Sequence, residues 1–159
     1  MNINDVISYL IRISEAKAKL MKDILDITQK QSFNIDEEHI NVLTNLIQQK
    51  QKCIDKVNIL NSEFTEKYNY IKKNLSIDSL DEISTLEYPQ IINLQAIIKN
   101  MDKIVEEIKY IDEKNNKAMM NALEVIKNEL RKIKNSRKIN VAYHIDMPLY
   151  NGIFIDKKK

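Results

Sequence analysis

The sequence predicts an all-α fold: an elongated antiparallel bundle of about three long helices with coiled-coil-like packing and an irregular C-terminal tail. The first observation is a ladder of apolar residues, spaced alternately four and three positions apart, which keeps one face of a helix apolar. The second is that the 159 residues include one Gly and two Pro, so few positions can interrupt a helix. The ladder residues are Val6, Leu10, Ile13, Leu20, Ile24 and Ile27, then Leu43, Leu46, Cys53, Val57, Leu60 and Phe64, then Leu94, Ile97, Met101, Ile104, Ile108 and Ile111.

The first two helices are bounded by polar residues that can satisfy free backbone amides. We expect the first helix over residues 4–31, with Asn4 or Asp5 as its cap. The pattern then breaks. Asp36, followed by two Glu residues, suits the start of a second helix because acidic groups are favoured there. This helix is expected to end near Leu75.

A longer break, over residues 76–89, precedes the third helix. Asp78 is expected to cap one short helical turn that ends at Ile83. Pro89 suits the first turn of the next helix, where a missing amide hydrogen costs nothing. The third helix is expected over residues 90–137, with no Pro or Gly inside it. Its ladder continues through Asn115, Ala118, Ala122 and Val125, flanked by Met119, Ile126, Leu130 and Ile133.

We divide the chain into a helical bundle, residues 1–137, and a C-terminal tail, residues 138–159. Helix 1 is shorter than the other two helices, so part of the helix 2–helix 3 hairpin should lack a third partner, and exposed apolar surface often marks a binding site. Pro148 and Gly152 argue against a continuous helix in the tail. Its apolar residues allow two interpretations: the tail folds back on the bundle, or it is a mobile segment that becomes ordered on a partner.

Polar residues interrupt the ladder at Lys17, Lys50 and Asn115. One interpretation is that they set the alignment of the bundle at some cost in stability, as buried polar residues do in coiled coils. The other is that they mark where a partner helix faces the bundle. Of the adjacent pair Met119 and Met120, we expect the first in the core and the second exposed, as pliable apolar surface for binding.

The composition argues against several classes of protein. The net charge of +2 and the presence of only three Arg speak against a nucleic-acid binder, which would show a basic face rich in Arg. No apolar run reaches the roughly 20 residues of a membrane span, and the first residues do not resemble a secretory signal. We therefore expect a cytoplasmic protein without membrane insertion, in which Cys53 is a small buried apolar residue.

The residues of common catalytic and metal sites are missing or isolated. His39 and His144 lie in different segments, without a Cys cluster or a neighbouring Glu at metal-ligand spacing. With one Gly, the chain cannot form a glycine-rich phosphate loop. We expect no enzyme activity, no cofactor and no metal.

Several segments carry a resemblance to a known family: Ile27–Gln31, Asn34–Asp36, Leu43–Lys50, Tyr143 and Phe154–Lys159. Together they resemble the FlgN-type flagellar export chaperones and, less closely, the FliT-type chaperones. The resemblance implies an all-helical cytoplasmic chaperone without catalytic activity, whose partners are late flagellar export substrates and the export machinery. FlgN-type members serve the hook–filament junction proteins, and FliT-type members serve the filament cap.

A self-associating coiled-coil structural or adaptor protein is the alternative, and a chaperone for the filament cap protein is the second alternative. The sequence leaves open the bound substrate, the oligomeric state and the choice between FlgN-type and FliT-type. We predict a partner-binding surface formed by the end of the third helix and the tail. Its residues are Met119, Met120, Leu123, Ile126, Leu130, Ile133, Tyr143, Tyr150 and Phe154.

Overall fold

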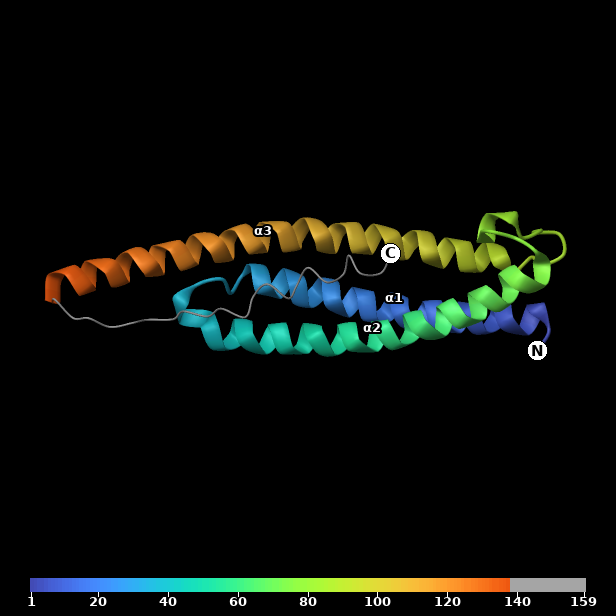
Figure 1. Cartoon of the computed structure of the whole chain (residues 1–159), viewed down its shortest axis with the longest axis horizontal. Helices are drawn as coiled ribbons and strands as arrows, with labels where there is room; N and C mark the ends of the chain where they lie inside the picture. Colours follow the sequence, from blue (N-terminus) through green and yellow to red (C-terminus); the bar gives the residue numbers. More distant parts are fainter. Residues whose placement is uncertain (138–159) are drawn as a thin grey trace.

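The computed structural model describes residues 1–137, with side chains described through Lys134. These residues form a bundle of three long helices that run up, down and up, so that α1 and α3 point the same way (Figure 1). The prediction of an elongated all-α bundle is confirmed. The elements are α1 (Ile3–Ser32), the 3₁₀ turn η1 (Glu37–His39), α2 (Ile40–Leu75), the 3₁₀ turn η2 (Leu80–Glu82) and α3 (Ile91–Arg137).

The caps of the first two helices differ from the expected ones. Asn2, and not Asn4 or Asp5, caps α1, because its Oδ1 accepts a hydrogen bond from the backbone amide of Asp5 at 2.8 Å. Asp36 is a cap, as expected, and accepts from the amide of His39 at 3.0 Å. It begins η1, however, and α2 follows only from Ile40.

The connector between α2 and α3 is organised by a capping box, not by Asp78. Oε2 of Glu82 accepts hydrogen bonds from the amides of Ser79 at 2.8 Å and Asp78 at 2.6 Å. These two bonds hold the pKa of the Glu82 carboxyl below its ordinary value. Pro89 lies before α3, which begins at Ile91, and not in its first turn as expected.

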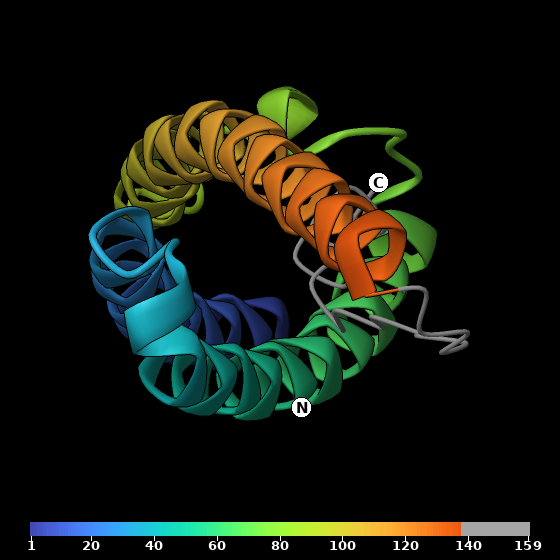
Figure 2. The same ribbon diagram turned by 90° about the vertical axis from the view of Figure 1, so that its left-hand side faces the viewer.

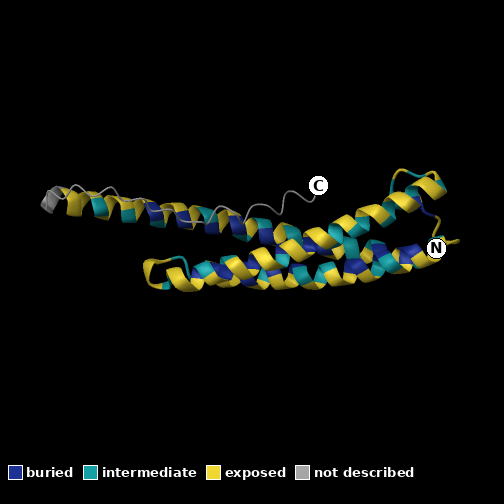
Figure 3. Cartoon of the chain, turned by 60° about the horizontal axis from the view of Figure 1, so that its bottom comes forward, coloured by how far each residue is buried: buried dark blue, intermediate teal, exposed yellow. Residues whose placement is uncertain are grey.

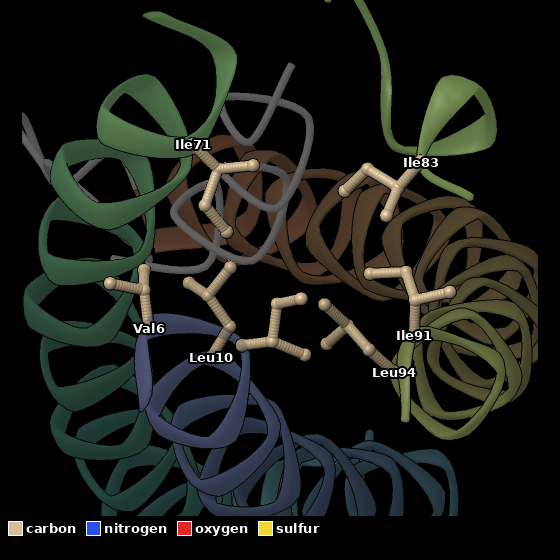
Figure 4. Packing of buried hydrophobic residues seen from close by; sticks show 7 residues of the cluster. Val6, Leu10, Ile71, Ile83, Ile91 and Leu94 are labelled. Carbon is tan, nitrogen blue, oxygen red and sulfur yellow. The ribbon is translucent and has the colours of Figure 1, made fainter. Parts of the chain in front are cut away.

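The core consists of clusters arranged along the rod, with α1 packed closely against both α2 and α3 (Figure 2). The first cluster joins the start of α1, the end of α2, the connector and the start of α3 (Figure 4). The second lies in the middle of the rod, and the third joins Leu43 to Met119 near the α1–α2 turn. The first cluster contains Val6, Ile7, Leu10, Ile71, Ile83, Ile91 and Leu94, and the second contains Met21, Ile24, Ile54, Val57 and Ile108.

The third helix is longer than the helices that cover it. It has 47 residues, against 30 in α1 and 36 in α2. Asn115 bonds to the last turns of α1, and Met119 packs on the first turn of α2. Beyond these contacts α3 continues past the α1–α2 turn (Figure 1). The expectation that part of the helix 2–helix 3 hairpin lacks a partner is therefore corrected: α3 alone projects.

Candidate partner-binding surface

A buried polar layer crosses the bundle just before α3 leaves it. Nζ of Lys50 in α2 lies 2.6 Å from Oδ1 of Asp112 in α3, and it also donates to Oε1 of Gln31 in α1 at 3.4 Å. Lys50 is 2% exposed and Asp112 is 8% exposed. Burial lowers the pKa of Lys50, and the Asp112 carboxylate opposes that shift. The buried ion pair therefore joins α2 to α3, and the hydrogen bond to Gln31 adds α1 to the same layer.

Asn115 joins the same layer to the end of α1. Its Nδ2 donates to the backbone oxygen of Thr28 at 3.1 Å, and its Oδ1 accepts from Oγ of Ser32 at 2.8 Å. Asn115 is 4% exposed and has partners for both ends of its amide. These bonds fix the place along α3 where α1 ends.

The third polar ladder residue, Lys17, also faces the bundle. Its Nζ lies 5.3 Å from the centre of the Phe64 ring of α2, a cation–π arrangement. Burial lowers its pKa, and Asp102 of α3 opposes the shift. Because Lys17, Lys50 and Asn115 all contact helices of this chain, the interpretation that they mark a partner helix is wrong.

The buried stripe on α3 differs from the sequence ladder in its second half. Asp112 is buried and Ile111 only half-buried, and Val125 is 54% exposed. The stripe steps by four residues twice in succession, at Asn115, Met119 and Leu123, and then continues in steps of three and four. Such a stutter shifts the stripe around the helix relative to a strict heptad. Met119 and Leu123 therefore occupy the stripe positions that the sequence ladder assigns to Ala118 and Ala122. The stripe is Met101, Val105, Ile108, Asp112, Asn115, Met119, Leu123, Ile126, Leu130 and Ile133.

We call residues 120–137 the α3 extension. Buried and half-buried positions continue along it beyond the α1–α2 turn (Figure 3). Leu123 is buried, Ile126 and Leu130 are half-buried, and Ile133 is 48% exposed. These four side chains form a helical stripe in steps of three and four, the pattern of a seam for another helix.

The two methionines where the bundle meets the α3 extension are buried and exposed as the sequence predicts. Met119 is 7% exposed and packs against Leu43, whereas Met120 is 51% exposed. The structure thus places five predicted site residues on one stripe, with Met120 beside it. That they contact a partner stays a prediction. Tyr143, Tyr150, Phe154 and the whole tail, as well as His144, lie outside the described residues.

Sequence reasoning missed the α1–α2 turn as part of this region. Phe33 is 81% exposed and Ile40 is 43% exposed, and Ile35, between them in sequence, packs on the Leu43–Met119 cluster. A Phe in a helix break, outside either ladder, was the available signal. The turn supplies exposed apolar side chains next to the place where α3 starts to project.

Within the part of the chain that the structure describes, neither a metal site nor a membrane span is found. Within residues 1–137, no group of three or more His, Cys, Asp or Glu is placed to hold a metal ion. His39 pairs with Asp36 at 2.7 Å and lies on the surface. Among the helices that the structure describes, none has both the length and the apolar character to cross a membrane.

Comparison with known proteins places the chain in a family. The family model described as FlgN protein matches residues 1–146. No curated protein and no solved structure gives a match. The match covers the whole bundle and the start of the tail, and so the chain belongs to the FlgN family, the flagellar export chaperones.

Proposed function

We propose that this FlgN-family protein is a cytoplasmic chaperone for late flagellar export substrates, and that these are the hook–filament junction proteins. In this proposal it binds helical segments of the substrate, keeps them soluble and presents them to the export machinery. It acts by contact, without catalysis, metal or cofactor. Family membership supports the role in flagellar export, and the α3 extension supports binding of a helix.

The single observation behind the proposal is that α3 projects beyond its own bundle with an apolar stripe. An apolar helix face is usually covered by another element. An amphipathic helix of a substrate can cover it, with apolar residues at every third and fourth position as anchors. Before export such a substrate helix would itself expose an apolar face, so both surfaces are removed from water together.

The stripe alone is too small to hold a substrate tightly. Full burial of an Ile or Leu side chain contributes about 1.5–3 kcal/mol, and Ile126, Leu130 and Ile133 are already partly covered. Their remaining contribution, roughly 1 kcal/mol each on that scale, does not exceed an association cost of about 4–15 kcal/mol. We therefore include the tail residues Tyr143, Tyr150 and Phe154, together with Met120, in the proposed surface.

Co-expression with hook–filament junction proteins tests the stripe. We expect the full chain to co-elute with them and to keep them in the soluble fraction. The Leu130→Asp, Ile133→Asp variant should lose both properties. The Asn121→Asp, Asn128→Asp variant adds the same two carboxylates at exposed positions of the same segment and should retain them. Equal substrate binding by the two variants would contradict the proposal.

A chain that ends at Ser136 tests the tail. We expect weaker substrate binding with helicity, measured by far-ultraviolet circular dichroism, nearly intact. Binding as tight as that of the full chain would exclude the tail from the surface. Loss of helicity would instead show that the tail belongs to the folded core.

Two further measurements distinguish the alternatives named from the sequence. Light scattering of the purified chain should give a monomer that gains mass with substrate, and a stable homo-oligomer would favour a structural or adaptor protein. Competition between hook–filament junction proteins and the filament cap protein should favour the former. Preference for the cap protein would instead favour the second alternative, a chaperone for the filament cap protein.

A further inference from the structure

The charges beside the apolar stripe of the α3 extension indicate what kind of helix fits there. Asp112 faces α2 through Lys50, and Asn115 faces α1 through Thr28. At about 100° per residue, Lys127 and Lys134 project about 60° and 40° from Asp112, whereas Asn115 projects about 60° to the other side. The two lysines therefore lie on the edge of α3 that faces α2 within the bundle.

Inside the bundle that edge of α3 supplies an acid and α2 supplies the base. Beyond the α1–α2 turn the edge supplies bases instead, because Lys127 and Lys134 are exposed there and lie two helical turns apart. Residues seven positions apart beside a seam contact the flanking residues of the facing helix. A helix that covers the stripe must therefore bring groups to both lysines.

We propose that the α3 extension binds an amphipathic helix of another protein that carries Asp or Glu beside its apolar stripe. This inference rests on the proposed function and specifies its substrate: the acidic flank pairs with Lys127 and Lys134 while the apolar residues cover Ile126, Leu130 and Ile133. The exposed Phe33 at the α1–α2 turn contacts the inner end of that helix.

A second copy of this chain fits the same surface poorly. In an antiparallel pair of extensions, Lys127 and Lys134 of one copy would face the same lysines of the other, and like charges across a seam are destabilising. A parallel pair would direct the second α3 into the α1–α2 turn, where Ile35 and Leu43 already pack on Met119.

The chain's own tail also lacks the required charge. Residues 138–159 contain two acidic residues, Asp146 and Asp156, against four Lys. Neither Asp is accompanied by another acid at heptad spacing. A partner with an acidic flank remains the occupant that fits the lysine edge.

Two synthetic three-heptad peptides test the inference against the full chain. Both have Leu on the apolar stripe; one has Glu at all flanking positions and the other has Lys, and like charges keep each peptide from pairing with itself. We expect the Glu peptide to bind about two- to tenfold more tightly, because two ion pairs in place of two repulsions outweigh the opposite effect of the exposed Glu129 on the other edge of the stripe. The Lys127→Glu, Lys134→Glu variant should invert this preference.

The Lys99→Glu, Lys103→Glu variant is the matched control, because it reverses two exposed charges of α3 within the bundle. It should keep the preference for the Glu peptide, and Leu130→Asp, Ile133→Asp should bind neither peptide. The inference is overturned by equal affinities, by no binding to the full chain, or by an unchanged preference in Lys127→Glu, Lys134→Glu. Binding of hook–filament junction proteins without any such preference would leave the proposed function standing and reject the acidic flank alone.

Discussion

Replacing Asp112 by Asn removes the only charge within salt-bridge distance of Lys50 among the interactions described for residues 1–137. Nζ of Lys50 lies 2.6 Å from the carboxylate, and the two side chains are 3% and 11% exposed. After the substitution the Lys50 ammonium still donates to Oε1 of Gln31, which lies 3.4 Å away, and it faces a neutral amide at position 112. Its charge then has no compensating carboxylate in a desolvated site.

Breaking a buried ion pair by removing one partner costs about 3–5 kcal/mol. Because Gln31 still accepts a hydrogen bond from Lys50, we expect the lower end of that range, about 3 kcal/mol. In a chain of this size 1 kcal/mol corresponds to about 2–4 °C in Tm, so the loss should be about 6–12 °C. Replacing both partners by Lys50→Met, Asp112→Leu should be within about 1 kcal/mol of the parent or more stable, since no charge is then buried.

Urea and thermal unfolding, followed by far-ultraviolet circular dichroism, measure both effects. Glu106→Gln, which removes an exposed carboxylate from the same helix, is the control and should change the unfolding free energy by less than about 0.5 kcal/mol. A loss of unfolding free energy in Asp112→Asn as small as that in Glu106→Gln would contradict a buried, unpaired charge on Lys50. An equally large loss in the double variant Lys50→Met, Asp112→Leu would also contradict it, because that variant contains no unpaired charge at this site.

Further outcomes can be measured on the same protein. Ile83→Ala should lower the unfolding free energy by about 2–5 kcal/mol, because Ile83 is 4% exposed in the first core cluster. Leu86→Ala, at a side chain 94% exposed, should lower it by less than about 0.5 kcal/mol. Similar losses in the two variants would contradict the packing of Ile83. Burial places the folded-state pKa values of Lys17 and Lys50 below 10.5. At pH values between those pKa values and 10.5 the unfolded chain therefore binds more protons than the folded chain, and the unfolding free energy should rise with pH across that range. Lys17→Met, Lys50→Met should flatten the rise, and an unchanged slope would exclude both lysines as its source. Burial and, to a lesser extent, the Asp23 carboxylate raise the pKa of the Cys53 thiol, so a thiol reagent at neutral pH should modify Cys53 more slowly in the folded than in the urea-unfolded chain; equal rates would contradict its partial burial.

The helices themselves could be predicted because their signal is repeated many times. Each ladder position adds to the same periodic pattern, so α2 ends at Leu75 as expected and α3 is helical from Ile91 through Arg137, the last residue that the structure describes. The caps could not be predicted as well. Asn2, Asn4 and Asp5 are all competent caps that differ by tenths of a kcal/mol, and the choice depends on where the first turn packs.

The burial of Asp112 could not be predicted from local pattern. Ile111 is the apolar residue at that step of the ladder, and burying a carboxylate in its place is unfavourable unless a cation meets it. That cation, Lys50, lies 62 residues away in sequence. The sequence shows Lys50 on a ladder position, but a pair of compensating charges becomes visible only when α2 and α3 are placed side by side.

The same ion pair explains why α3 projects by a defined length. Over residues 101–115 the stripe of α3 keeps a heptad repeat, so a slide of one heptad, about 10 Å, would still turn these positions toward the bundle. Such a slide would bring Val105 or Met119 opposite Lys50 and leave the ammonium buried without a carboxylate, at a cost of about 3–5 kcal/mol. It would also separate Asn115 from Thr28 and Ser32, to which it is now bonded. The polar layer therefore favours one alignment of the three apolar stripes, and that alignment determines how much of α3 lies beyond the α1–α2 turn.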